Sequence, residues 1–159
     1  MRRIRGVAII GTVVILAACA AGGGGDSAAA GDGSGDPGGT TVDVTLQEWA
    51  VVLSEASVPA GDVTFAITNE GPEDVHEFVI LRTDLDMAAL PTDDTGAVDE
   101  AGEGMEVVDE VEDVEVGASA ELTVTLEAGS YVVVCNVYSE DEDEAHYQMG
   151  MRTALTATD

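Results

Sequence analysis

The chain has 159 residues, enough for one domain of ordinary size, and 45% of them are hydrophobic. Its formal charge is −27, because 32 acidic residues face only 5 basic ones. Contacts to phosphate groups need Lys and Arg, so this charge argues against nucleic acid as a partner. Such an acidic surface either steers cationic partners or is a general adaptation to salt, and composition leaves both interpretations open.

The amino terminus has the features of an export signal. Residues 1–5 contain three of the five arginines, and residues 6–16 form an apolar stretch that is too short for a comfortable membrane span. The sequence LAAC at 16–19 then resembles the lipobox of bacterial lipoproteins, in which the cysteine is lipid-modified and becomes the first residue. We therefore expect a lipoprotein signal peptide at 1–18 and a lipid on Cys19; the alternative is an uncleaved amino-terminal anchor.

A linker separates this signal from the domain. Residues 19–40 start at the lipidated cysteine and are rich in Gly, Ala, Ser and Asp, a composition that cannot build a core. A flexible coil of about 20 residues has a root-mean-square reach of roughly 25 Å. We therefore expect an exported domain that is anchored to the cell membrane by lipid and faces the periplasm or the extracellular side.

Strand signals dominate residues 41–159, so we expect one all-β domain there. Apolar alternation, β-branched runs and intervening turn residues predict strands over 41–46, 49–58, 63–67, 75–81, 122–126, 131–137 and 153–158. Short strands of this kind indicate an antiparallel Greek-key β-sandwich or barrel. Residues 83–117 break the pattern, and we expect them to form one long acidic excursion with one or two short helical turns.

The chain holds few side chains that bind transition metals, and they occur in the order His76, Cys135, His146, Met. With Cys19 lipidated, Cys135 has no partner for an intramolecular disulfide, and a leftover thiol in an exported protein needs an explanation. Thiolate and thioether ligands select Cu(I), and imidazole binds either oxidation state. A plane of two His and one Cys with a long axial Met is the ligand set of a blue-copper electron-transfer site.

Each ligand taken alone also has a structural interpretation. A lone Cys after an apolar run is usually a small buried hydrophobe, a lone His beside an acidic loop is usually solvated, and Met beside a strand is usually core. The ordered set of all four favours copper. Two methionines, Met149 and Met151, compete for the axial position.

These residues and the phrases around them resemble the cupredoxins, the blue-copper family of plastocyanin, azurin and rusticyanin, over residues 41–159. The phrases that carry the resemblance are VPAGDVTFAITNEG, HEFVIL, YVVVCNV and HYQMGM. The resemblance implies a cupredoxin-like fold and one mononuclear type 1 copper held by His76, Cys135 and His146. It implies Met151 as the axial ligand, because a Gly-Met pair after the second His is a feature of the rusticyanin-like branch. It also implies that the ring edge of His146 reaches the surface and carries the electron.

One departure from the family is the spacing of 11 residues between Cys135 and His146, where well-studied members have only a few. The insertion contains a run of 5 acidic residues at 140–144. Either one of these carboxylates supplies an oxygen ligand to the metal, or the insertion bulges into solvent. We also expect backbone N–H groups near Cys135 to donate to its thiolate.

These features predict an electron carrier rather than an enzyme, because both histidines are committed to copper and none remains for a catalytic triad. We expect a membrane-tethered, extracytoplasmic carrier whose partner is a cationic redox protein, such as a c-type cytochrome or a membrane oxidase. The alternative is a copper-binding or copper-delivery protein without a redox partner. A sandwich that has lost its metal is disfavoured, since the candidate ligands are intact.

Overall fold

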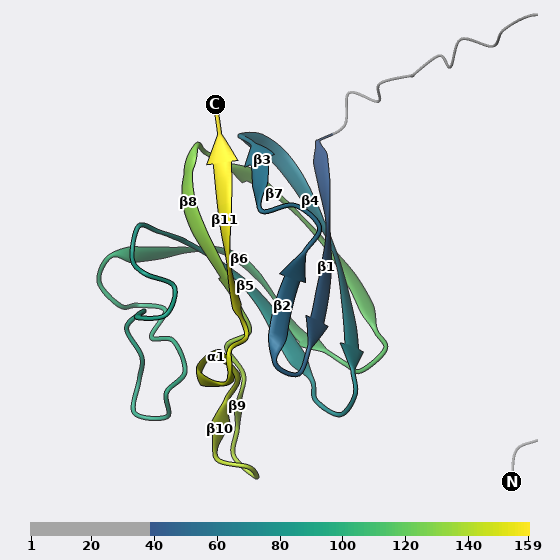
Figure 1. Cartoon of the computed structure of the whole chain (residues 1–159), viewed down its shortest axis with the longest axis vertical. Coiled ribbons are helices and arrows are strands. Elements are labelled where there is room, and N and C mark those ends of the chain that lie inside the picture. The colour runs from purple at the N-terminus through teal and green to yellow at the C-terminus, as the bar shows by residue number, and fades with distance from the viewer. Residues whose placement is uncertain (1–38) are drawn as a thin grey trace, which may run out of the picture. The chain divides into compact units, whose positions relative to one another are not determined.

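The computed structural model describes residues 39–159, which form two packed β-sheets (Figure 1). The expected signal peptide, Cys19 and nearly all of the linker lie outside the described residues. Within 39–159, no helix is both long enough and apolar enough to cross a membrane.

Nine strands make up the two sheets. The four-stranded sheet has the order β2 (Ala50–Leu53), β1 (Thr40–Gln47), β4 (Gly61–Gly71) and β7 (Ser119–Leu126). The five-stranded sheet has the order β3 (Ser57–Pro59), β11 (Arg152–Thr158), β8 (Gly129–Val134), β5 (His76–Thr83) and β6 (Met105–Val114). A small hairpin of β9 (Tyr138–Ser139) and β10 (Glu144–Ala145) precedes one short helix, α1 (His146–Met149).

The prediction of an all-β sandwich is confirmed, but the sheets are mixed rather than purely antiparallel. β1 pairs with β4 in parallel, and β11 pairs with β3 in parallel, while the other pairs are antiparallel. The prediction of one strand over 49–58 is wrong, because this segment forms two strands that belong to different sheets. The chain turns back along β1 as β2, then crosses to the other sheet as β3 before β4 returns beside β1.

The core between the sheets comes from the expected alternation of side chains. Val42, Val44 and Leu46 of β1 are fully or almost fully buried, as are the inward residues of β4. They pack against Phe78 and Ile80 of β5 and against inward residues of β8 and β11. Period-2 burial on both sheets is what a two-layer sandwich requires.

β5 and β8 differ from the other strands because both of their faces are buried. Val79 and Leu81 of β5 and Val132 and Val134 of β8 form a second apolar cluster on the outer face of the five-stranded sheet. The segment 84–104, which lies beside β8 in Figure 1, covers that face with residues that include Leu90. This second layer explains why the runs FVIL and YVVVC are continuously apolar instead of alternating.

The predicted long excursion exists, but it is shorter than expected and contains no helical turn within its described residues. Within 83–117, strands are absent from residues 84–104, apart from an isolated bridge between Thr92 and Val98, and from the turn at 115–117. The remainder includes β6, a strand of 10 residues that pairs with β5 at the sheet edge. Its acidic side chains obscured the strand pattern, since only the face toward the core needs apolar residues.

Candidate metal centre

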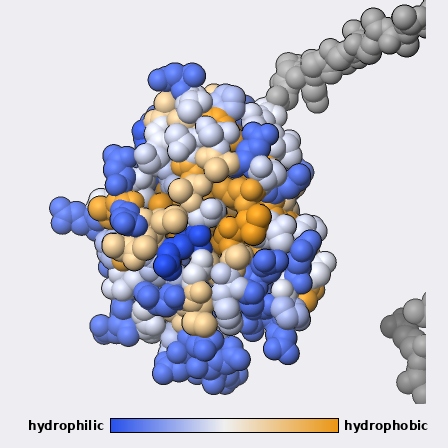
Figure 2. Space-filling view, in the orientation of Figure 1, coloured by the Kyte–Doolittle hydropathy of each residue, from blue (hydrophilic) through white to orange (hydrophobic). Residues whose placement is uncertain are grey.

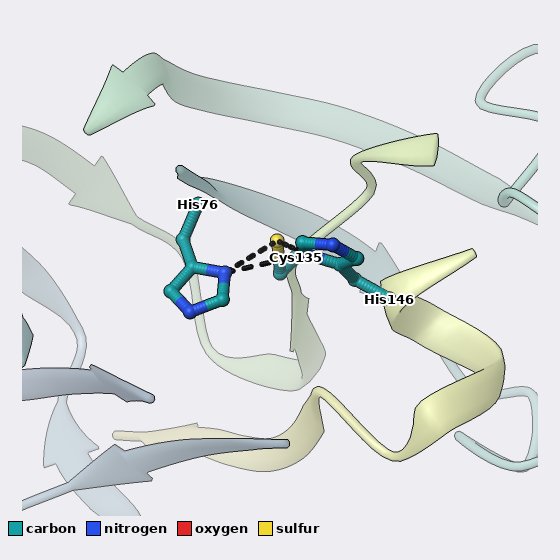
Figure 3. A group of neighbouring side chains, drawn as sticks. All are labelled: His76, Cys135 and His146. Carbon is teal, nitrogen blue, oxygen red and sulfur yellow. Dashed lines mark hydrogen bonds between the residues drawn. The ribbon is translucent and has the colours of Figure 1, made fainter. Parts of the chain in front are cut away.

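The sandwich brings His76, Cys135 and His146 together at one end (Figure 3). His76 is the first residue of β5, and Cys135 directly follows β8, its antiparallel neighbour in the sheet. His146 begins α1, and its backbone N–H donates to the carbonyl of Val137, which returns the chain to the cysteine. His76, which is far away in sequence, therefore meets Cys135 and His146 at one point.

The facing atoms of the three side chains form a small triangle. The Nδ1 atoms of His76 and His146 are 3.2 Å apart. The Sγ atom of Cys135 lies 3.4 Å from Nδ1 of His146 and 3.8 Å from Nδ1 of His76. Figure 3 shows both rings turned toward the sulfur, so each histidine presents the same ring nitrogen to the centre.

The triangle has the size that a transition-metal ion requires. An ion bonded in a plane at about 2.0 Å to nitrogen and 2.3 Å to sulfur separates the two nitrogens by roughly 3.5 Å and the sulfur from each nitrogen by roughly 3.7 Å. The three separations in the structure lie within about 0.3 Å of these values. A thiolate with two imidazoles is a donor set that suits copper, so the residues fit the group that the sequence implies.

The histidines are buried and held in the neutral form. His76 is 0% exposed and His146 is 1% exposed. Burial lowers the pKa of both rings, and the neighbouring His146 lowers the pKa of His76 further. A neutral imidazole has a free lone pair, which a metal ligand needs.

Cys135 is a fully buried thiol. Burial raises its pKa to about 11, although backbone N–H groups, including that of Glu77, act in the opposite direction. The N–H of Glu77 donates to Sγ at 3.2 Å. This contact agrees with the expectation that backbone N–H groups donate to the sulfur. A metal ion displaces the proton of a thiol that it binds.

The two methionines lie in different environments. Met151 is 0% exposed and belongs to the same core cluster as Cys135. Its carbonyl accepts a hydrogen bond from the N–H of Cys135 at 3.0 Å, and its N–H donates to the carbonyl of His146 at 3.1 Å. Met149 is 41% exposed. The backbone thus ties Met151, and not Met149, to two of the three candidate ligands.

The insertion between Cys135 and His146 forms the hairpin of β9 and β10. Its tip, residues 140–143, is exposed, and none of its carboxylates joins the metal triangle among the described residues. The hairpin extends beyond α1 in Figure 1, and the same end of the molecule is hydrophilic in Figure 2. Of the two interpretations, the bulge into solvent is therefore the one that the structure supports.

The expectation that His146 reaches the surface is wrong for this structure. The residue is almost completely buried, and Trp49 packs against it edge-on, with ring centroids 5.0 Å apart and an angle of 68° between the rings. Trp49 is itself half-buried. The family pattern gives no warning of this, because Trp49 comes from the β1–β2 turn, which contains no ligand.

Two buried or half-buried amides near the centre were missed as functional residues. Asn69 is 0% exposed, and its Nδ2 donates to the carbonyls of Asp74 and Val114 at 2.8 Å, which fixes the loop before His76. Asn136 follows Cys135, and its Oδ1 accepts the N–H of Val98 at 2.6 Å. The Asn-x-Gly pattern at 69–71 was a sequence signal for Asn69. Asn136 has no such signal, because it pairs with Val98, which is far away in the sequence.

No family model and no curated protein sequence matches the chain. Solved structures do match it. The auracyanin of Roseiflexus castenholzii is 24% identical, with a TM-score of 0.54 over 77% of this chain and 100% of its own. Auracyanin A, a "blue" copper protein of Chloroflexus aurantiacus, is 20% identical, with a TM-score of 0.52 over 76% of this chain and 100% of its own.

Rusticyanin of Thiobacillus ferrooxidans is 18% identical, with a TM-score of 0.50 over 76% of this chain and 79% of its own. At these identities the likeness is one of fold. It agrees with the two-sheet architecture and with the resemblance seen in the sequence. The described part of this chain therefore has the β-sandwich fold of the cupredoxins.

Proposed function

We propose that this protein is an electron carrier that holds one mononuclear type 1 copper between His76, Cys135 and His146, with Met151 as the axial ligand. The observation that carries the proposal is the buried triangle of two imidazole nitrogens and one sulfur with sides of 3.2, 3.4 and 3.8 Å. Copper in such a ligand set supplies a one-electron couple. The cupredoxin fold and the "blue" copper of auracyanin A support the same conclusion.

The chain's contribution is to hold the ligands still. Cys135 and His76 lie at the ends of adjacent strands, and the backbone of Met151 is bonded to both Cys135 and His146. Ligands fixed on strands by packing and hydrogen bonds change position little when the charge of the metal changes. Burial also keeps water away from the centre. Both features favour rapid electron transfer over catalysis on a bound substrate.

The location and the partner follow from sequence and charge. The lipobox-like LAAC supports anchoring by Cys19 to the cell membrane, with the domain facing the periplasm or the extracellular side. The exposed carboxylates of 140–143 stand beside the helix that carries His146. They favour a cationic partner, such as a c-type cytochrome or a basic face of a membrane oxidase.

Repeated redox cycling with a chelator challenge tests this function. The protein is loaded with one equivalent of Cu(II), reduced with ascorbate and reoxidised with ferricyanide several times, with bathocuproine disulfonate added in the reduced state. An electron carrier retains its copper and returns to the same spectrum in each cycle. Loss of Cu(I) to the chelator in the first reduced state would contradict the proposal and favour copper delivery.

A further inference from the structure

The outer ring nitrogen of His76 has no hydrogen-bond partner. Nδ1 of this ring faces the metal triangle, and the opposite nitrogen, Nε2, is buried and unsatisfied. A buried polar atom without a partner is unfavourable, so such an atom needs an explanation. The charged group that faces it is Glu48, whose Oε1 lies 3.8 Å from Nε2.

Glu48 is held in place by the loop that leads into His76. It lies in the turn between β1 and β2, with a side chain that is only 11% exposed. Its Oε1 accepts the N–H groups of Glu73 at 3.0 Å and Asp74 at 2.7 Å. Its second oxygen, Oε2, is buried without a partner. The carboxylate is thus fixed beside the ring and still has unused acceptor capacity.

The charge of Glu48 suits this position. The backbone N–H groups of Asp74 and Glu73 both donate to its Oε1, an environment that favours the ionised carboxylate. The unsatisfied Nε2 of His76 thus faces a carboxylate whose other oxygen has no partner, and a shift of about 1 Å would bring Nε2 within hydrogen-bond distance of Oε1.

We propose that Glu48 is a positioning residue for His76: its carboxylate accepts the Nε2–H of the ring and keeps Nδ1 unprotonated for copper. This inference rests on the proposed function. A carboxylate behind a metal-binding histidine fixes the tautomer and the ring orientation and makes the ligand more basic. A more basic ligand stabilises Cu(II) more than Cu(I), so Glu48 also lowers the reduction potential of the site.

The first test needs no copper. Nitrogen-15 NMR of the metal-free protein reports which ring nitrogen of His76 carries the proton. We expect the Nε2–H tautomer in the wild type and a loss of this preference in Glu48→Gln. Glutamine retains a carbonyl oxygen for the N–H groups of Glu73 and Asp74, and unchanged amide shifts of these residues will show that the loop is intact. An Nδ1–H tautomer in the wild type overturns the proposal, whether or not the variant folds.

The second test measures copper itself, with Glu73→Gln as the matched control. Glu73 lies in the same loop and is exposed, so its substitution removes one charge without touching His76. Glu48→Gln should bind Cu(II) about 10–100-fold more weakly and have a higher reduction potential, as expected when the outer partner of a metal-binding histidine is lost. Glu73→Gln should change the affinity less than about twofold. Equal effects of the two variants would refute the role of Glu48.

The two tests separate this inference from the proposed function. If the Nε2–H tautomer of the wild type is lost in Glu48→Gln but the wild type gives no type 1 copper signal, the electron-carrier function is contradicted and the Glu48–His76 contact is supported. A normal type 1 signal that is unaffected by Glu48→Gln would support the function and refute the positioning role.

Discussion

Glu77 is a half-buried carboxyl group among other acids, and we predict that Glu77→Gln stabilises the metal-free protein. Its carboxylate lies with those of Glu100 and Glu110 in a group in which one oxygen of each residue lies within 4.8 Å of the others. Burial is the main cause that raises the pKa of Glu77 to about 7, and the negative charges of Glu100 and Glu110 raise this pKa further. Ionising this group in the folded protein is therefore unfavourable at neutral pH.

The size of the effect follows from the pKa values. The difference between 4.5 and about 7 corresponds to roughly 3.4 kcal/mol when the group is fully ionised in both states. Glu77 is partly exposed, so solvent screening reduces this value, and we expect about 1–3 kcal/mol. Glutamine has almost the same shape, so packing should be retained.

The sign of the pH dependence is fixed by the raised pKa. Below pH 4.5 the carboxyl group is protonated in both states, and its charge does not affect folding. As the pH rises from 4.5 to about 7, the unfolded chain releases this proton first, so the folded state loses stability. The stabilisation by Glu77→Gln should therefore be small near pH 5 and complete near pH 8.

Urea unfolding of the metal-free protein at pH 5 and pH 8 measures this difference. The control is Glu121→Gln on β7, an exposed carboxylate whose removal changes the net charge equally. A surface substitution of this kind usually changes stability by no more than about 0.5 kcal/mol. If Glu77→Gln stabilises no more than the control at pH 8, or equally at both pH values, the reasoning about this cluster is refuted.

Three further predictions concern the copper site. Met151→Leu should keep copper and shift the reduction potential measured by voltammetry, whereas Met149→Leu should leave the potential nearly unchanged. The reverse pattern would make Met149 the axial ligand. Replacing the acids of 140–144 by amides should slow electron transfer to a basic c-type cytochrome at low salt. The effect should be small well above 0.1 M, because the screening length is already only about 10 Å at 0.1 M. An equal rate at low salt would exclude the hairpin from docking. Binding of Cu(II) at pH 8 should release about one proton, measured in a weakly buffered solution. Burial raises the pKa of the Cys135 thiol to about 11, so the thiol is protonated at pH 8, whereas the histidines are already neutral. Absence of proton release would show that the sulfur is not a ligand.

The fold could be predicted from the sequence wherever burial is one-sided. β1 and β4 alternate strictly, because one face of each strand packs in the core, and both were expected near their observed positions. β6 was missed, because acids occupy most of its exposed positions and hide the strand pattern. The division of 49–58 into two strands was also missed. β2 pairs with β1, which precedes it directly, but β3 pairs with β11, which is distant in sequence, so local patterning does not show that β3 belongs to the other sheet.

The candidate ligands could be predicted because His, Cys and Met are rare in this chain and their order is specific. Their convergence in the structure agrees with that order. The residues around them could not be predicted in the same way. Glu48 and Trp49 reach His76 and His146 only because the β1–β2 turn lies against the centre, and no spacing in the sequence encodes that contact.

The central claim is a type 1 copper bound by His76, Cys135 and His146, and the most direct test is a visible absorption and EPR spectrum of the protein with one equivalent of Cu(II). We predict an intense blue or green thiolate-to-copper band with a type 1 EPR signal, both of which disappear in Cys135→Ser. A pale sample with an ordinary cupric EPR signal, or a Cys135→Ser variant that remains deep blue, would contradict the account.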